Sequence, residues 1–143
     1  MSCLVCACGG GDPKATIVDN DGNEVLLSAK EVEELYDTNQ VSFEKKYAGA
    51  KIHFIGTVKS VDEHLGGLGE ATRVSDIEFK EGWEVTVPSE EYEAIILEMS
   101  EGTKVEVTTN IMNVSINVNC RGADVGGGYN EDTMKTTILK IAE

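Results

Sequence analysis

The sequence predicts a mainly β protein with short helices, in which five or six antiparallel strands form a barrel behind a small hairpin and a helix. Three observations support this fold class. Apolar residues alternate with polar ones over many short stretches, as in half-buried strands. Glycine-containing turns separate these stretches. In a few other stretches the apolar residues repeat at helical spacing. A chain of 143 residues fits one domain, so we expect a flexible leader over residues 1–14 and a single domain over residues 15–143.

The first expected element of the domain is a hairpin over residues 15–27. Two apolar runs flank the turn Asn-Asp-Gly-Asn at residues 20–23, and Asp-Gly favours a tight turn because both central residues tolerate positive φ. Ser28 and Glu31 have the spacing of a capping box, so a helix should begin directly after the hairpin. The apolar residues on one face of this helix are Val32, Leu35 and Tyr36. We expect this face to pack on the barrel.

The longest strand is expected over residues 51–61. A second helical turn with Phe43 and Tyr47 and then a turn at Gly49 precede it. Apolar and polar residues alternate along the strand, and Gly56 interrupts it. A bulge or a sharp bend is therefore expected at this glycine.

Two further strands, over residues 72–79 and 82–87, should form a second hairpin. Ser89 then has the position of a helix cap, and Gly102 should end that helix. The apolar residues of this helix are Tyr92, Ile95, Ile96 and Met99. The remaining expected strands cover residues 103–109, 111–120 and 133–141. A helix between the third and fourth strands of a five-stranded antiparallel barrel is the arrangement of an OB-fold, so the order of elements predicts an OB-fold barrel with at least one extra strand.

Several packing and turn positions suggest a known family. They are the helix before Asn39, the turn Phe43-x-x-x-Tyr47-x-Gly49, the strand Ile55-Gly56-Thr57-Val58, and Pro88 before the helix with Tyr92. From about Val32 to its C-terminus the chain resembles the bacterial tRNA_anti-like family of OB-folds. The resemblance implies an exported or lipid-anchored OB domain that binds nucleic acid. The nucleic-acid role is an analogy at the level of the fold, because function depends on sites.

The N-terminal residues Val5-Cys6-Ala7-Cys8 are similar to the end of a bacterial lipoprotein signal, in which the last cysteine is cleaved and lipidated. A signal peptide needs a charged start and about 7–15 apolar residues, whereas seven residues precede Cys8. The similarity therefore implies a start upstream of this chain. We expect lipidation at Cys8, contact with the membrane through that anchor alone, and a location in the bacterial cell envelope. If the similarity is accidental, a cytoplasmic protein is expected.

The sequence indicates neither a metal, nor a cofactor, nor a catalytic site. Cys3 and Cys6 have the spacing of half a zinc site, but a structural zinc needs four ligands in two close pairs, and Cys120, His53 and His64 do not supply a second pair. No serine lies in a nucleophile elbow, and the glycine-rich loops lack the lysine and hydroxyl residue of a phosphate-binding loop. We therefore expect a protein that is not an enzyme.

The net charge of the chain favours some classes of ligand over others. The 26 acidic and 12 basic side chains give a net charge of -14, which repels the phosphates that supply most non-specific nucleic-acid affinity. We expect a non-catalytic OB-fold binding module of an envelope lipoprotein, whose ligand is a cationic protein, peptide or envelope component. The alternative is a single-stranded nucleic-acid or tRNA-type binding protein, which would use aromatic and basic residues of the second and third barrel strands. The candidate contacts are Lys59, Arg73, Phe79, Lys80, Trp83 and Arg121.

Overall fold

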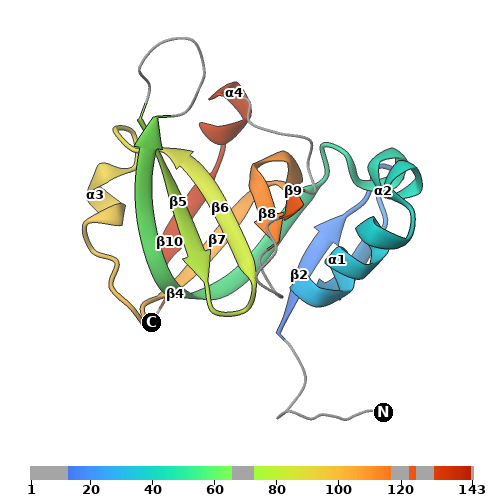
Figure 1. Ribbon diagram of the computed structural model, residues 1–143, viewed down its shortest axis with the longest axis horizontal. Coiled ribbons are helices and arrows are strands. Elements are labelled where there is room, and N and C mark those ends of the chain that lie inside the picture. Colours follow the sequence, from blue (N-terminus) through green and yellow to red (C-terminus); the bar gives the residue numbers. More distant parts are fainter. Residues whose placement is uncertain (1–12, 66–72, 117–122, 125–130, 143) are drawn as a thin grey trace.

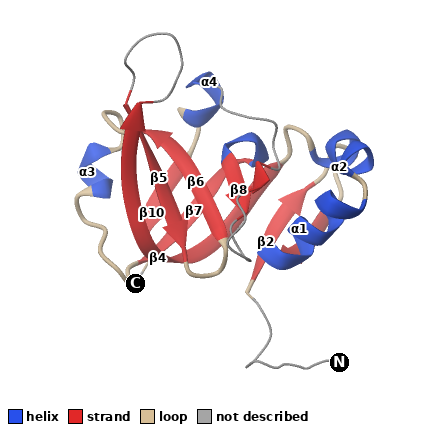
Figure 2. Cartoon of the chain, in the orientation of Figure 1, coloured by secondary structure: helices blue, strands red, loops and turns tan. Residues whose placement is uncertain are grey.

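One curled antiparallel sheet forms most of the molecule. The computed structural model describes residues 13–65, 73–116, 123–124 and 131–142, and in these residues the chain is mainly β (Figure 2). The sheet bends into a half-barrel, with α1 and α2 beside one end and α3 beside the other (Figure 1). The predicted fold class, mainly β with antiparallel strands and short helices, is confirmed at this level.

The N-terminal hairpin is formed by β2 (Lys14–Val18) and β3 (Glu24–Ser28) and is confirmed. Gly22 in its turn has a φ of 87°, a backbone region that favours glycine. β2 also pairs with the start of β4 (Lys51–Leu65), so the hairpin extends the main sheet and does not merely precede it. Residues 1–12 of the expected leader lie outside the described residues, and Lys14 already belongs to β2.

The two helices after the hairpin are α1 (Ala29–Thr38) and α2 (Gln40–Tyr47). The capping box at the start of α1 is confirmed, because the Ser28 hydroxyl accepts from the Glu31 amide at 3.1 Å and Glu31 Oε1 accepts from the Ser28 amide at 2.9 Å. Val32 is fully buried as expected, whereas 43% of Leu35 is exposed. The predicted packing face is therefore wrong at Leu35, which lies beside a hollow between α1 and α2.

β4 belongs to both halves of the curl. Its first part, residues 51–57, pairs with β7 (Lys104–Asn110), and its second part, residues 58–65, pairs with β5 (Arg73–Phe79). The bulge expected at Gly56 is wrong, since Gly56 pairs with Val105 in regular register and the irregularity lies between Val58 and Ser60. The reason for the glycine is packing, because the Phe79 ring lies directly against it.

The second hairpin is confirmed and consists of β5 and β6 (Trp83–Pro88). The helix after it, α3 (Glu93–Ile96), begins later than predicted. Ser89 does not cap this helix; its buried hydroxyl instead lies 2.7 Å from the Ser75 hydroxyl on β5. Ser89 therefore forms a hydrogen bond to a neighbouring strand and not the expected capping bond to the start of the helix.

The C-terminal strands are shorter than predicted. The strand expected over residues 111–120 begins as a 3-10 turn, η1 (Ile111–Asn113), followed by β8 (Val114–Ile116), and residues 117–120 lie outside the described residues. The strand expected over residues 133–141 is instead α4 (Glu131–Met134) followed by β10 (Ile138–Ile141). Asn110 starts η1 because its side chain accepts from the Met112 amide at 2.9 Å.

The sheet has the strand order β10-β7-β4-β5-β6-β8-β9, where β9 is Ala123–Asp124. Among the described strands β10 pairs with β7 alone and β9 with β8 alone. The sheet therefore curls without closing into a full ring of strands.

A polar network holds the C-terminal segment against the sheet. The Tyr92 hydroxyl donates to the Thr137 carbonyl oxygen at 2.6 Å. The Thr137 side chain lies 2.7 Å from the Thr109 hydroxyl of β7, and the Asn113 amide donates to that same hydroxyl at 2.9 Å. Burial, and the nearby negative charge of Glu91, raise the pKa of Tyr92.

Candidate functional site

The two aromatic candidates lie inside the half-barrel. Phe79 and Trp83 are each 1% exposed. Trp83 stacks on Phe54 with 5.2 Å between ring centroids, and Phe79 meets Phe54 edge to face at 5.4 Å. Both rings are thus core residues and offer no face on which a nucleic-acid base could stack.

The basic candidates do not form one patch. Lys59 lies 3.4 Å from Glu78, Arg73 lies 3.3 Å from Glu63, and Lys80 lies 3.6 Å from Glu101. Each of these cations therefore already faces a carboxylate. Arg73 begins β5 and Lys80 follows its last residue, which separates them by roughly 20 Å along the strand. Arg121 and Cys8 lie outside the described residues, as do Cys3, Cys6 and Cys120.

The outer face of β4, β5 and β6 is acidic instead. Register explains this, because residues alternate between the two faces of a sheet. The row Val61, Ile77 and Val85 faces the core, where Ile77 and Val85 are fully buried. The rows on either side of it lie on the opposite face of the sheet, where the acidic residues range from half-buried to exposed and Thr86 is buried. They carry four carboxylates, which we name the acidic face: Asp62, Asp76, Glu78 and Glu84.

Like charges lie directly opposite each other on this face. Asp62 pairs with Asp76 in the β4–β5 register, and Glu78 pairs with Glu84 in the β5–β6 register. Such pairs are unfavourable across adjacent strands. Cations moderate this repulsion, since Lys59 contacts Glu78 and the His64 ring contacts Asp76.

His64 and Asp76 form a hydrogen-bonded chain across three strands. His64 Nε2 lies 2.7 Å from Asp76 Oδ2, and Thr86 Oγ1 on β6 donates to Asp76 Oδ1 at 2.6 Å. The second ring nitrogen of His64, Nδ1, lies 3.0 Å from the Leu65 carbonyl oxygen. This arrangement was missed at the level of sequence, because pairing of His64 with Asp76 depends on the register of the β4–β5 hairpin.

The acidic face has the chemistry of a surface for cations and not of a metal centre. In the described part of the chain, no group of three or more histidine, cysteine or acidic side chains could hold a metal ion. A row of carboxylates on a regular sheet can instead attract a lysine- or arginine-rich segment of another molecule.

A second histidine–carboxylate pair lies on the other half of the sheet. His53 Nε2 on β4 is 2.8 Å from Glu106 Oε2 on β7. This hydrogen bond lowers the pKa of the exposed Glu106 carboxyl. The residues opposite His53 on the two neighbouring strands are Thr16 and Thr108. His53 therefore has no carboxylate directly opposite it on these strands.

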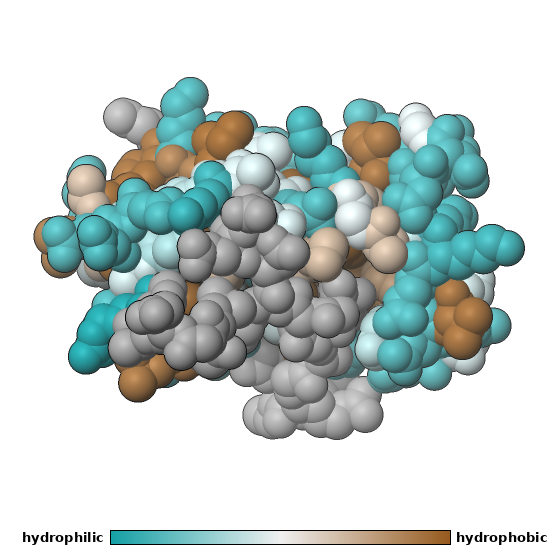
Figure 3. Space-filling view, turned by 90° about the horizontal axis from the view of Figure 1, so that it is seen from above, coloured by the Kyte–Doolittle hydropathy of each residue, from teal (hydrophilic) through white to brown (hydrophobic). Residues whose placement is uncertain are grey.

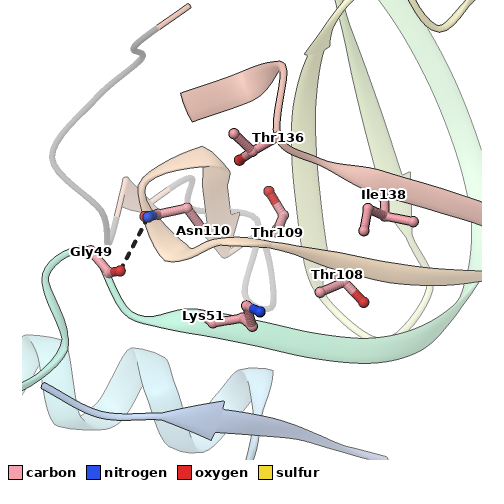
Figure 4. A pocket seen from close by; sticks show the side chains of 7 residues that line it. All are labelled: Gly49, Lys51, Thr108, Thr109, Asn110, Thr136 and Ile138. Carbon is pink, nitrogen blue, oxygen red and sulfur yellow. Dashed lines mark hydrogen bonds between the residues drawn. The ribbon is translucent and has the colours of Figure 1, made fainter. Parts of the chain in front are cut away.

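A small hollow opens between the first part of the sheet and the C-terminal segment. Its volume is about 280 Å³, and Lys51, Thr108, Thr109, Thr136 and Ile138 are among the residues around it. Figure 4 shows the hollow between β4 and β7 below and the α4–β10 segment above, with the Asn110 amide donating to the Gly49 carbonyl oxygen at 3.1 Å. Ligand pockets are usually larger and mostly apolar, from roughly 300 Å³ upward. The hollow therefore ranks behind the acidic face as a candidate site.

Exposed apolar side chains are scattered. Figure 3 shows separate apolar spots among hydrophilic residues on the face it draws. The large exposed apolar residues lie on several elements, with Ile55 and Leu65 at separate places on β4, and scattered residues of this kind are normal on a protein surface. They are Leu26, Leu35, Val41, Ile55, Leu65, Leu97 and Ile138.

Comparison of the chain with protein-family models, curated proteins and solved structures finds no match. None of the helices that the structure describes has both the length and the apolar character needed to cross a membrane.

Proposed function

We propose that this protein is a non-catalytic binding module of OB-fold type, and that the acidic face binds a cationic segment of a protein or peptide. The observation behind the proposal is the orientation of the β4–β5–β6 sheet. Its carboxylates Asp62, Asp76, Glu78 and Glu84 lie on the sheet face opposite to Phe79 and Trp83, which face the core.

The arrangement of elements supports an OB-type barrel. β4 is the shared strand that pairs with β5 on one side and β7 on the other. α3 lies between β6 and β7 along the chain, where the helix of an OB-fold is found. The outer surface of the second and third barrel strands is the usual ligand face of this fold, and here it coincides with the acidic face. The arrangement differs from a closed OB-fold barrel at β6. Here β8 pairs with β6, at the edge where another strand of the ring would be expected to close the barrel.

The nucleic-acid alternative has less support. Binding of single strands needs stacking platforms flanked by cations. Both candidate platforms are buried, and each described candidate cation contacts a carboxylate. The face that an OB-fold would use is also negative, which disfavours phosphates.

The cell-envelope location is part of the proposal and depends on Cys8, which lies outside the described residues. Labelled palmitate, supplied to bacteria that express the natural gene, tests it. Incorporation that disappears in a Cys8→Ser variant supports a lipid anchor. A product that takes up no label in either form contradicts the anchor and favours a cytoplasmic protein.

The ligand class is tested by fluorescence anisotropy with a labelled oligolysine peptide, an oligoglutamate peptide and single-stranded DNA, at low and at near-physiological salt. We expect the oligolysine peptide alone to bind. The variant Asp62→Asn/Glu84→Gln removes two charges from the acidic face, and Glu24→Gln/Glu34→Gln removes two from β3 and α1. Exposed ion pairs contribute about 0.2–1 kcal/mol each, so the first variant should weaken binding by roughly two- to thirtyfold.

The control variant should bind almost as tightly as the natural protein. Equal losses in the two variants would mean attraction to the net charge alone and would contradict a site on the acidic face. Salt-sensitive binding of DNA would instead support the nucleic-acid alternative.

A further inference from the structure

We propose that His64 is a proton-dependent latch, which in its doubly protonated form fastens the end of the β4–β5 hairpin and opens when it loses a proton. The latch goes beyond the proposed function, because it needs no ligand and concerns the fold of the hairpin itself. It is built from His64 and Leu65 on β4, Asp76 on β5 and Thr86 on β6.

The geometry requires a proton on each ring nitrogen. Nδ1 lies 3.0 Å from the Leu65 carbonyl oxygen, which can only accept. Nε2 lies 2.7 Å from Asp76 Oδ2, and an ionised carboxylate also only accepts. A neutral imidazole has one N–H and can satisfy one of these partners. The imidazolium satisfies both, so loss of its proton sets a nitrogen lone pair against an oxygen lone pair.

Thr86 fixes the other end of the chain. Its hydroxyl donates to Asp76 Oδ1 at 2.6 Å, which keeps Oδ2 directed at the His64 ring. Thr86 is 2% exposed and lies opposite Asp76 in the β5–β6 register. The carboxylate is therefore held from the inner strand β6, and the histidine joins β4 to this fixed group.

The surrounding charges favour the protonated ring. Carboxylates lie on the same face from each of the three strands: Asp62 on β4, Asp76 on β5 and Glu84 on β6. The neighbouring cation Arg73 contacts Glu63. Among the described residues, a neutral His64 would leave Asp62 and Asp76 opposed to each other across β4 and β5 with no positive charge between them, and such like-charge pairs destabilise a hairpin.

The pKa of His64 agrees with the geometry. The hydrogen bond to the Leu65 carbonyl, followed by the hydrogen bond and charge of Asp76 and the charge of Glu84, raises this pKa above the usual 6.5, although partial burial opposes the shift. A raised pKa in the folded state means that the stabilisation is complete below pH 6.5 and is lost as the pH rises through the folded-state value. The latch should thus be closed in mildly acidic solution and open in mildly alkaline solution.

The second histidine provides a matched control. The chain contains two histidines, and each contacts a carboxylate on a neighbouring strand. His53 differs because only its Nε2 has a described partner, Glu106. One N–H is enough for that contact, so His53→Gln should not remove a proton-dependent latch.

The test combines the NMR titration of both imidazoles with amide hydrogen exchange at about pH 5 and about pH 8, corrected for the intrinsic rates. Exchange is compared in residues 61–65 and 73–77 for the natural protein, His64→Gln and His53→Gln. We expect His64 to titrate above 6.5 and the protection of these amides to fall on going to the higher pH. The fall should approach tenfold for each pKa unit above the usual value. His64→Gln should show the lower protection at both pH values, and His53→Gln should behave like the natural protein.

Asp76→Asn separates the latch from general loss of structure. An asparagine can still accept from Thr86 and keeps the shape of the side chain, so the hairpin should form while the pKa of His64 falls towards 6.5. The latch is overturned if His64 titrates at or below this value, if protection does not change with pH, or if His53→Gln removes the change as completely as His64→Gln.

Discussion

A methyl group at Gly56 should destabilise the protein, because the Phe79 ring occupies the space beside this glycine. A Cβ at this position would lie 2.5 Å from Phe79 Cδ1 and 2.7 Å from Phe79 Cγ, whereas non-bonded carbon atoms normally lie about 3.5–4.0 Å apart. The ring would have to move by about 1 Å. Phe54 opposes such a move, since its ring meets Phe79 edge to face and stacks on Trp83.

The expected loss of stability follows from two opposing effects. Overpacking of a filled core costs about 1–3 kcal/mol. Replacement of glycine by alanine at a compatible backbone position returns about 0.4–1 kcal/mol through the unfolded state. Gly56→Ala should therefore destabilise the protein by roughly 1–2 kcal/mol. For a domain of this size the thermal midpoint should fall by about 4–8 °C.

A double-mutant cycle identifies the cause. Phe79→Leu replaces the rigid ring by a smaller side chain, which keeps Cγ but can turn its δ carbons away from the new methyl group. This change should itself cost about 1 kcal/mol. In the presence of Phe79→Leu the loss from Gly56→Ala should shrink by about 1 kcal/mol or more, as for residues in direct contact. Urea titration with a fluorescence readout of Trp83 measures all four proteins.

Gly102→Ala is the control for this cycle. Gly102 has a φ of 94° and open space around its Cα, so alanine there costs about 1–2 kcal/mol through backbone strain. That loss should be the same with Phe79 and with Leu at position 79. Strict additivity of Gly56→Ala and Phe79→Leu would refute steric conflict with the ring as the reason for the glycine.

Three further changes test other parts of the fold. Tyr92→Phe removes the hydroxyl that donates to the Thr137 carbonyl. It should lower stability by about 1–2 kcal/mol and increase amide exchange in β10. An unchanged unfolding midpoint would contradict the role of this hydrogen bond in holding the C-terminal segment. Ser28→Ala removes the cap of α1 and should cost about 1 kcal/mol in urea unfolding, whereas Ser28→Thr should cost less; equal losses would argue against capping. The hydrogen bond from Lys14, followed by that from the Ser28 amide, lowers the pKa of Glu31 below 4.5, so its stabilisation is present above that pH and is lost as the pH falls through the folded-state value. Lys14→Met should raise the pKa of Glu31 in an NMR titration, and a value that does not move would contradict this pairing.

Local signals in the sequence predicted the first elements well. The Asp-Gly turn and the capping box each depend on residues within four positions of one another, and both are confirmed. Ser89 shows the limit of such signals. It stands where a cap belongs, but its hydroxyl bonds to Ser75 on another strand, which no local pattern reveals.

The same contrast applies to the candidate site. Alternation along the strands contained enough information to place the aromatics, because Phe79 shares a face with Ile77, and Trp83 shares one with Val85 and Val87. The contact between His64 and Asp76 depended on the register between β4 and β5, which no local pattern in the sequence sets. Composition indicated a negative protein, but the placement of four carboxylates together on one sheet face depended on the pairing of β4, β5 and β6.

Asp76 takes part in both proposals about this face. The two proposals predict opposite pH dependences, one for the stability of the hairpin and one for the binding of a cationic peptide. The latch strengthens the hairpin when His64 is protonated. The same proton adds a positive charge next to Asp62, Asp76 and Glu84, so it should weaken the attraction of a cationic peptide. Binding of oligolysine should therefore increase between about pH 5 and about pH 8, while protection of the hairpin decreases. In His64→Gln both pH dependences should disappear, because no other histidine lies on the acidic face among the described residues. If peptide binding fails and the change in protection persists, the latch stands without the proposed ligand. If binding persists without a pH-dependent hairpin, the ligand proposal stands without the latch.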